Sequence, residues 1–212
     1  MSICTQISEL VQKGKAKLVK EEVAKAIESG VPVADILNEG LLAAMGIVGE
    51  KFKNNQVYVP EMLVAARAMN AGMEILKPHL VEAGVEPIGK VILGTVAGDL
   101  HDIGKNLVKL MLEGKGIEVV DLGIDVPAEK FVEAYNEHGS SLILLSALLT
   151  TTMGEMKNVI EAFAKAGLRD KVKFMIGGAP ITETFKNEIG AEYYTADAAT
   201  AASLAKEIIT AA

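Results

Sequence analysis

Apolar residues recur at helical spacing through the first part of the chain, and no strand-like alternation interrupts them up to about residue 85. One apolar stripe runs along residues 37–52, and a second follows Pro60, which suits the first turn of a helix. The stripes are formed by Leu37, Leu41, Met45, Val48 and Phe52 and by Met62, Met69, Met73 and Leu76. Two shorter helices are expected over residues 3–13 and 15–29, because a glycine ends each. Four helices with short connections predict a helical bundle.

The pattern changes near residues 83–89, where Gly and Pro mark a linker. Beyond the linker, short runs rich in Val, Ile and Leu alternate with amphipathic helical stretches, which is typical of a parallel sheet covered on both faces. Strands are expected near residues 91–96, 118–121, 142–146 and 173–177, with a weaker one near 192–194. Five such units predict an α/β fold with a doubly wound, flavodoxin-like strand order rather than a barrel. The sequence therefore predicts a helical domain over residues 1–87 and an α/β domain over residues 88–212.

The most informative segment is Asp99-Leu100-His101-Asp102-Ile103-Gly104, which directly follows the first expected strand. His101 is therefore expected on the loop at the carboxyl end of a buried strand, where open α/β sheets place their ligands. Asp99 can accept a hydrogen bond from one ring nitrogen of His101, which leaves the other nitrogen free to bind a metal. Gly104 allows the backbone to come close to a large group.

Two further motifs follow later strands. Ser146-Ala147-Leu148 follows the apolar run of the third expected strand, and Gly177-Gly178 follows that of the fourth. Because the carboxyl ends of parallel strands meet at one edge of a sheet, all three motifs are predicted to converge there.

The three motifs Asp-x-His-x-x-Gly, Ser-x-Leu and Gly-Gly together resemble the pattern of the corrinoid-binding family. This family includes the cobalamin domain of methionine synthase and the small corrinoid proteins of methyltransferase systems. The resemblance implies a cobalamin or related corrinoid, with His101 as the lower axial cobalt ligand in place of the cofactor's own benzimidazole. It also implies that Asp99 tunes His101, and that Thr152 completes the hydrogen-bond relay where methionine synthase has a serine. Asp99, His101 and Thr152 are the candidate catalytic residues.

The same resemblance implies further contacts with the corrinoid. Its nucleotide tail is expected to enter a deep cleft of the sheet past the glycines, so that leucine at Gly178 would block uptake and leave the fold largely intact. A helical cap precedes the cobalamin domain of methionine synthase and covers the reactive face of the corrin; residues 50–62 resemble its ring-contacting segment. The implied cofactor-binding residues are Asp99, His101, Gly104, Ser146, Leu148, Thr150, Thr152, Gly177 and Gly178 of the α/β domain and Phe52, Tyr58, Val59 and Met62 of the cap.

The resemblance covers nearly the whole chain and is strongest to the stand-alone corrinoid proteins of one-carbon metabolism in anaerobes. It implies a carrier that one substrate-specific methyltransferase loads and a second unloads to tetrahydrofolate or coenzyme M, with a reductive activator as a further partner. The methyl donor would be methanol, a methylamine, an aryl methyl ether or a betaine. Two alternatives stay open: a cobalamin-sensing regulatory module, and the cobalamin subunit of a carbon-skeleton mutase.

Charge and composition exclude several other functions. The formal net charge of −7 and the lack of a basic run argue against a nucleic-acid partner. The single cysteine, Cys4, fits a reducing cytoplasm, and no signal peptide or membrane-length apolar run is visible. Lys105 follows Gly104, but the spacing of a phosphate-binding loop is missing, as are a zinc-type Cys/His cluster and a nucleophile elbow.

Overall fold

A computed structural model describes residues 2–211. The chain divides into two compact units, the first comprising residues 1–87 and 114–116 and the second residues 88–113 and 117–212. Within the described residues, no helix combines the length and the apolar character needed to cross a membrane.

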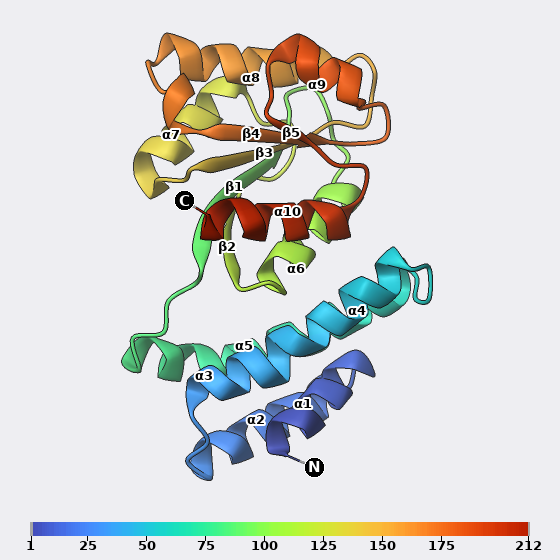
Figure 1. Ribbon diagram of the computed structural model, residues 1–212, viewed down its shortest axis with the longest axis vertical. Helices are drawn as coiled ribbons and strands as arrows, with labels where there is room; N and C mark the ends of the chain where they lie inside the picture. The colour runs from blue at the N-terminus through green and yellow to red at the C-terminus, as the bar shows by residue number, and fades with distance from the viewer. Residues whose placement is uncertain (1, 212) are drawn as a thin grey trace. The chain divides into compact units, whose positions relative to one another are not determined.

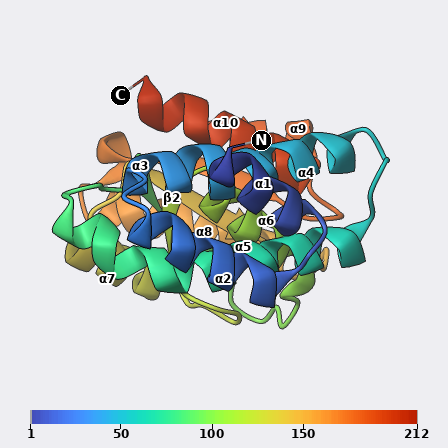
Figure 2. The ribbon, with the colours of Figure 1, turned by 90° about the horizontal axis from the view of Figure 1, so that it is seen from below.

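The first unit is helical (Figure 2). Its elements are α1 (Ile3–Gln12), α2 (Ala16–Glu28), the short α3 (Val33–Asp35), the π-helix η1 (Ile36–Leu42), α4 (Ala43–Lys53) and α5 (Val59–Glu82). The helix α5 packs on α2, and α1 packs on both η1 and α4. Gly72 makes the first of these contacts possible, because a β-carbon there would lie 2.8 Å from a methyl group of Val19 on α2.

The stripe predicted along residues 37–52 is only partly correct. The chain widens into a π-helix between Ile36 and Leu42, so Ile36 is buried and Leu37 is only half-buried. The prediction assumed a regular α-helix with 3.6 residues per turn, so it did not include this shift of the buried face. On α5, Met73 is also half-buried rather than part of the core.

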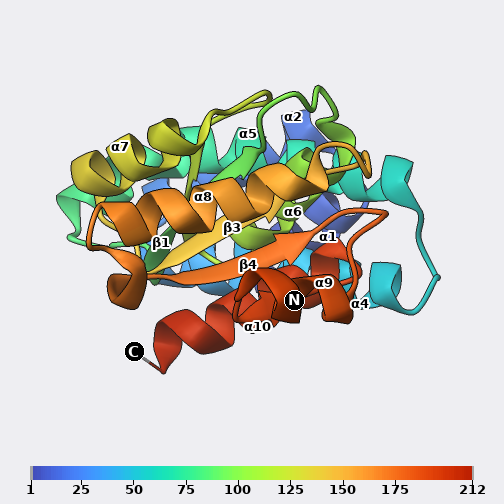
Figure 3. The same cartoon turned by 90° about the horizontal axis from the view of Figure 1, so that it is seen from above.

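The second unit is a five-stranded parallel sheet in the order β2-β1-β3-β4-β5. The strands are β1 (Gly89–Thr95), β2 (Ile117–Asp121), β3 (Leu142–Ser146), β4 (Lys173–Gly177) and β5 (Tyr193–Tyr194). The helices α6 (Ile103–Glu113) and α10 (Ala198–Thr210) cover one face, and α7 (Ala128–His138), α8 (Met153–Lys165) and α9 (Glu183–Ile189) cover the other (Figures 1 and 3). A short 3-10 helix, η2 (Arg169–Lys171), precedes β4. The predicted flavodoxin-like order is confirmed.

Large apolar side chains fill the space between the sheet and α7 and α8. Phe163 of α8 meets Phe174 of β4 edge to face, with ring centroids 5.2 Å apart. Phe131 of α7 is fully buried in the same cluster, and Gly94 of β1 lies close beneath its ring. This packing gives the loops at the strand ends a rigid base.

Candidate functional site

The three sequence motifs meet at the carboxyl edge of the sheet, as predicted. Thr95, at the end of β1, pairs with Ser146 of β3, and Ser146 pairs with Gly177 of β4. The loops that follow these residues therefore start at the same level of the sheet, and segments about 50 residues apart in sequence can exchange hydrogen bonds.

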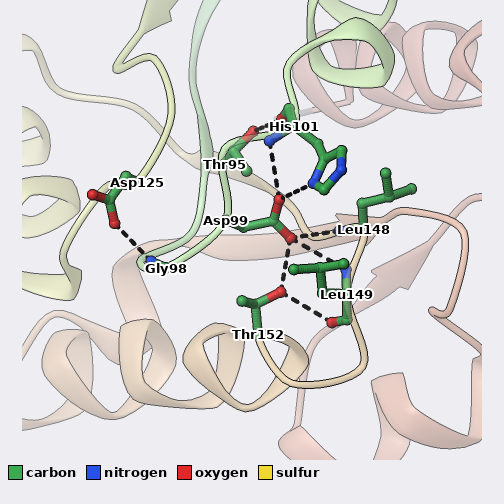
Figure 4. A network of polar contacts seen from close by, with 8 residues as sticks. All are labelled: Thr95, Gly98, Asp99, His101, Asp125, Leu148, Leu149 and Thr152. Carbon is green, nitrogen blue, oxygen red and sulfur yellow. Dashed lines mark hydrogen bonds and ion pairs between the residues drawn. The ribbon is translucent and has the colours of Figure 1, made fainter.

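Asp99 is the hub of these loops (Figure 4). Its carboxylate has no exposed surface and accepts hydrogen bonds through both oxygens. Oδ1 accepts from the backbone N–H of His101 at 3.1 Å and lies 2.8 Å from Nδ1 of the same histidine. Oδ2 accepts from the backbone N–H groups of Leu148 at 2.7 Å and Leu149 at 3.3 Å, and from the Thr152 hydroxyl at 2.7 Å. The Asp99 carboxylate thus ties the loop after β1 to the loop after β3.

These contacts keep Asp99 ionised. Burial alone raises the pKa of this carboxyl, but the hydrogen bonds from Leu148, Thr152 and His101 outweigh burial, and the net pKa lies well below its ordinary value. A carboxylate that accepts several hydrogen bonds in a buried place is a strong acceptor for an imidazole N–H.

His101 is held by one ring nitrogen and presents the other. Because the ionised Asp99 carboxylate can only accept, Nδ1 is the donor of this pair and Nε2 is left for another partner; about half of the side chain (49%) is exposed. An exposed, oriented imidazole nitrogen is a suitable ligand for a first-row transition metal. The described residues contain no group of three or more His, Cys, Asp and Glu side chains that could hold a metal ion. One oriented imidazole nitrogen can complete the ligand set of a metal that brings its other ligands with it.

The surroundings of His101 are apolar and open. Leu100 and Ile103, close to His101 in sequence, are 68% and 76% exposed, and Leu148 and Leu149 of the loop after β3 are also exposed. A β-carbon added to Gly104 would meet no atom within 4 Å. Exposed apolar side chains beside a metal-competent histidine fit a large apolar ligand such as a corrin ring.

The structure shows that a glycine is required at position 178 for a reason other than the predicted passage of the nucleotide tail. Its φ of +137° is a conformation that L side chains rarely adopt, and a β-carbon would lie 1.8 Å from the carbonyl oxygen of Ala147. The space beside Gly178 is thus occupied by the backbone of the loop after β3. The expectation that leucine at this position leaves the fold intact is wrong, because the side chain would collide with the protein itself. At Gly177 a β-carbon would meet only the Thr195 carbonyl oxygen at 3.3 Å.

The other predicted cofactor-binding residues lie in different settings. Ser146 is half-buried at the end of β3, and Thr150 is exposed in the loop that follows. In the helical unit, Tyr58 is 67% exposed, directly before α5. Phe52 and Val59 are half-buried.

Met62 is buried, as its place in the apolar stripe after Pro60 predicts. It has no exposed surface, because it belongs to the buried face of α5 with Ala65, Ala66 and Met69. The role of Met62 as a cap contact stays a prediction.

Two residues at the site were not foreseen from the sequence. Thr95 is buried, and its hydroxyl donates to the carbonyl oxygen of His101 at 2.9 Å. Asp125, in the turn after β2, accepts from the N–H of Gly98 at 2.6 Å. A hydroxyl at the last position of β1 and an aspartate shortly after Gly123 were the only sequence signals for these contacts.

We expect Asp99→Asn to lower the free energy of unfolding by roughly 2–4 kcal/mol at pH 7, because an amide cannot accept all the hydrogen bonds that reach the carboxylate. The folded-state pKa of Asp99 is depressed, so its stabilising contribution is complete above the unfolded pKa of about 3.9 and is lost as the pH falls through the folded pKa. The difference in unfolding free energy between wild type and variant should therefore narrow below about pH 4. Urea titrations over a pH series measure it, with exposed Asp170→Asn as the control. A gap that does not change with pH would contradict an ionised, hydrogen-bonded Asp99.

Comparison with known families agrees with this geometry. One family described as "B12 binding domain" matches residues 89–204. A second family with the same description matches residues 3–77. The two matches fall on the α/β part and on the helical part of the chain.

Several known proteins are similar to this chain over most of its length. A corrinoid protein of Desulfitobacterium hafniense (strain Y51) is 37% identical over 212 residues, covering 99% of this chain and 98% of the relative. Dimethylamine corrinoid protein 2 of Methanosarcina acetivorans is 41% identical over 206 residues, covering 96% and 94%. Among solved structures, the methanol:cobalamin methyltransferase complex MtaBC from Methanosarcina barkeri contains a chain that matches with a TM-score of 0.91 at 31% identity, covering 99% of this chain and 80% of that one.

Proposed function

The chain belongs to the B12-binding family of corrinoid proteins, and we propose that it carries a methyl group on a bound corrinoid from one methyltransferase to another. The cofactor is cobalamin or a related corrinoid. The observation that carries the proposal is the relay from Thr152 through buried Asp99 to Nδ1 of half-exposed His101.

His101 would hold the cobalt of the corrinoid through Nε2, since Nδ1 is engaged by Asp99. Asp99 fixes the tautomer and the orientation of the ring. Thr152 donates to Asp99 Oδ2 and keeps the carboxylate ionised and in place. When bound, the cobalt of the corrinoid supplies the chemistry, accepting a methyl group from one partner's substrate and releasing it to the other's.

The residues around His101 would bind the rest of the cofactor. Leu148 offers an exposed apolar side chain, and the open space beside Gly104 leaves room for a bulky group. Ser146, Thr150 and Gly177, at and beyond the ends of β3 and β4, are proposed to contact the nucleotide tail.

The names of similar proteins indicate which partners to propose. Several relatives are named for dimethylamine or trimethylamine, and one matching solved structure is a methanol:cobalamin methyltransferase complex. The first partner is thus a methyltransferase specific for a small methylated compound. The second methyltransferase, with tetrahydrofolate or coenzyme M as acceptor, and a reductive activator complete the proposed set.

The two alternatives receive less support. A cobalamin-sensing module and the cobalamin subunit of a mutase share the α/β domain, but relatives that cover 90–96% of this chain are named dimethylamine or trimethylamine corrinoid proteins. The second family match, over residues 3–77, extends the likeness to the helical unit.

A direct test uses the protein reconstituted with cobalamin and reduced to Co(I). With a methyl donor alone, the protein should form no demethylated product. When the matching methyltransferase is added, about one equivalent of methyl group per corrinoid should be transferred to the protein. Absorbance spectra and product analysis measure the two amounts, and the methyltransferase without the carrier is the control. Repeated turnover by this chain alone would contradict the carrier function.

A further inference from the structure

The loop that carries His101 is hydrogen-bonded to the turn after β2. This turn has no part in the function described above. The carboxylate of Asp125 accepts from the N–H of Gly98 at 2.6 Å, and the Asp125 N–H donates to the carbonyl oxygen of Asp99 at 3.0 Å. Asp125 thus binds two consecutive residues of the loop, one of which is the hub of the relay. Figure 4 shows Asp125 on the side of this loop away from Thr152.

The backbone of Asp125 is set in an unusual conformation for this purpose. Its φ of +53° is left-handed, a region that few residues other than glycine enter and that aspartate tolerates better than most. Neighbouring bonds hold the turn there, since Val126 donates to the carbonyl oxygen of Thr95 and Thr95 donates to that of Gly123, both at 3.0 Å. Gly98, at φ +74°, turns its N–H toward the carboxylate. A left-handed residue fixed on both sides is a feature of sites where geometry matters.

A further hydrogen bond fixes the loop at His101. The buried hydroxyl of Thr95 donates to the carbonyl oxygen of His101 at 2.9 Å. The loop is therefore held at Gly98 and Asp99 by Asp125, and at His101 by Thr95. Since Asp99 touches His101 through its side chain, any shift of the Asp99 backbone would reach the imidazole ring.

We propose that Asp125 is a positioning residue for His101, acting through the backbone of Gly98 and Asp99 to fix the direction of Nε2. This inference rests on the proposed function, in which His101 ligates cobalt. The acceptor oxygen of the Asp125 side chain is the essential part, because it lies 2.6 Å from the Gly98 nitrogen and accepts its N–H.

Three substitutions separate the role of the acceptor oxygen from that of the backbone conformation. Asp125→Asn keeps an acceptor oxygen and tolerates the left-handed backbone; Asp125→Gly keeps the backbone and loses the acceptor; Asp125→Ala loses both. Exposed Asp170, on η2, provides the control variant Asp170→Ala. In the protein without cofactor, amide hydrogen exchange at Gly98 should be about tenfold faster in Asp125→Gly and Asp125→Ala than in wild type. Asp125→Asn and Asp170→Ala should stay near wild type.

The decisive readout is electron paramagnetic resonance of the Co(II) holoprotein labelled with nitrogen-15 histidine. The ratio of histidine-ligated to unligated Co(II) should fall about tenfold in Asp125→Gly and Asp125→Ala and recover in Asp125→Asn. An unchanged ratio in Asp125→Gly, with a nitrogen-15 doublet in wild type, would overturn this inference and leave the proposed function intact. A nitrogen-14 triplet in labelled wild type would instead overturn the ligand role of His101, and this inference with it.

Discussion

Replacing His101 with alanine is expected to abolish coordination of cobalt by the protein. In wild type labelled with nitrogen-15 histidine, the axial splitting of the Co(II) spectrum should be a doublet, because the ligand would be Nε2 of His101 rather than the cofactor's benzimidazole. His101→Ala should lose this doublet completely. Some corrinoid can remain bound to the variant through the other cofactor contacts, so the loss of ligation is a sharper measure than the loss of binding.

The chain offers matched controls for this experiment. It contains two other histidines, His79 near the end of α5 and His138 at the end of α7, and both are partly exposed. His79→Ala and His138→Ala should keep the doublet unchanged. A triplet that persists in labelled wild type would mean that the cofactor keeps its own base on cobalt, and that the relay serves another purpose.

The largest loss of stability is expected at Gly178. Gly178→Ala would place a β-carbon 1.8 Å from the Ala147 carbonyl oxygen and force a side chain into φ +137°. We expect the free energy of unfolding to fall by roughly 2–5 kcal/mol, because backbone must move and strain is added. Urea denaturation of the protein without cofactor measures this loss. The displaced segment leads directly to Leu148, whose N–H reaches Asp99, so the relay should be disturbed as well.

Gly104→Ala is the contrasting substitution. Nothing lies within 4 Å of its added β-carbon, and Gly104 stands in the first turn of α6. The free energy of unfolding of Gly104→Ala should equal that of wild type or exceed it by up to about 1 kcal/mol, as for other Gly-to-Ala changes in helices. Cobalamin affinity should fall if the corrinoid fills that space. Equal stability of Gly178→Ala and wild type would contradict the close approach at Gly178.

Much of the fold could be predicted because its signals are local. The apolar runs of β3 and β4 are short and bounded by turn residues, and their predicted limits agree with the structure. The run of β1 was placed at residues 91–96, whereas the strand spans Gly89–Thr95 and Val96 makes only an isolated bridge to Val126. Strand ends are weakly marked by hydrophobicity, since the last apolar residue can already belong to the loop.

The site could be predicted where its partners are close in sequence. Asp99 and His101 are two residues apart, so their contact is visible in the motif. Thr152 was reached only through the resemblance to methionine synthase, because nothing local connects it to Asp99. Asp125 was missed because its role depends on a left-handed turn and on the pairing of β1 with β2. Gly178 was misread because the neighbour that excludes a side chain comes from another loop.

The hydrogen bond between Thr152 and Asp99 spans 53 residues of chain. No local segment can form it early in folding, because β1 and β3 must first align. Nε2 of His101 is therefore fixed in direction only after the centre of the sheet has assembled. A chain that stalls before that point would offer the corrinoid an unrestrained imidazole, so stable capture of the cofactor is reserved for molecules that have completed their fold.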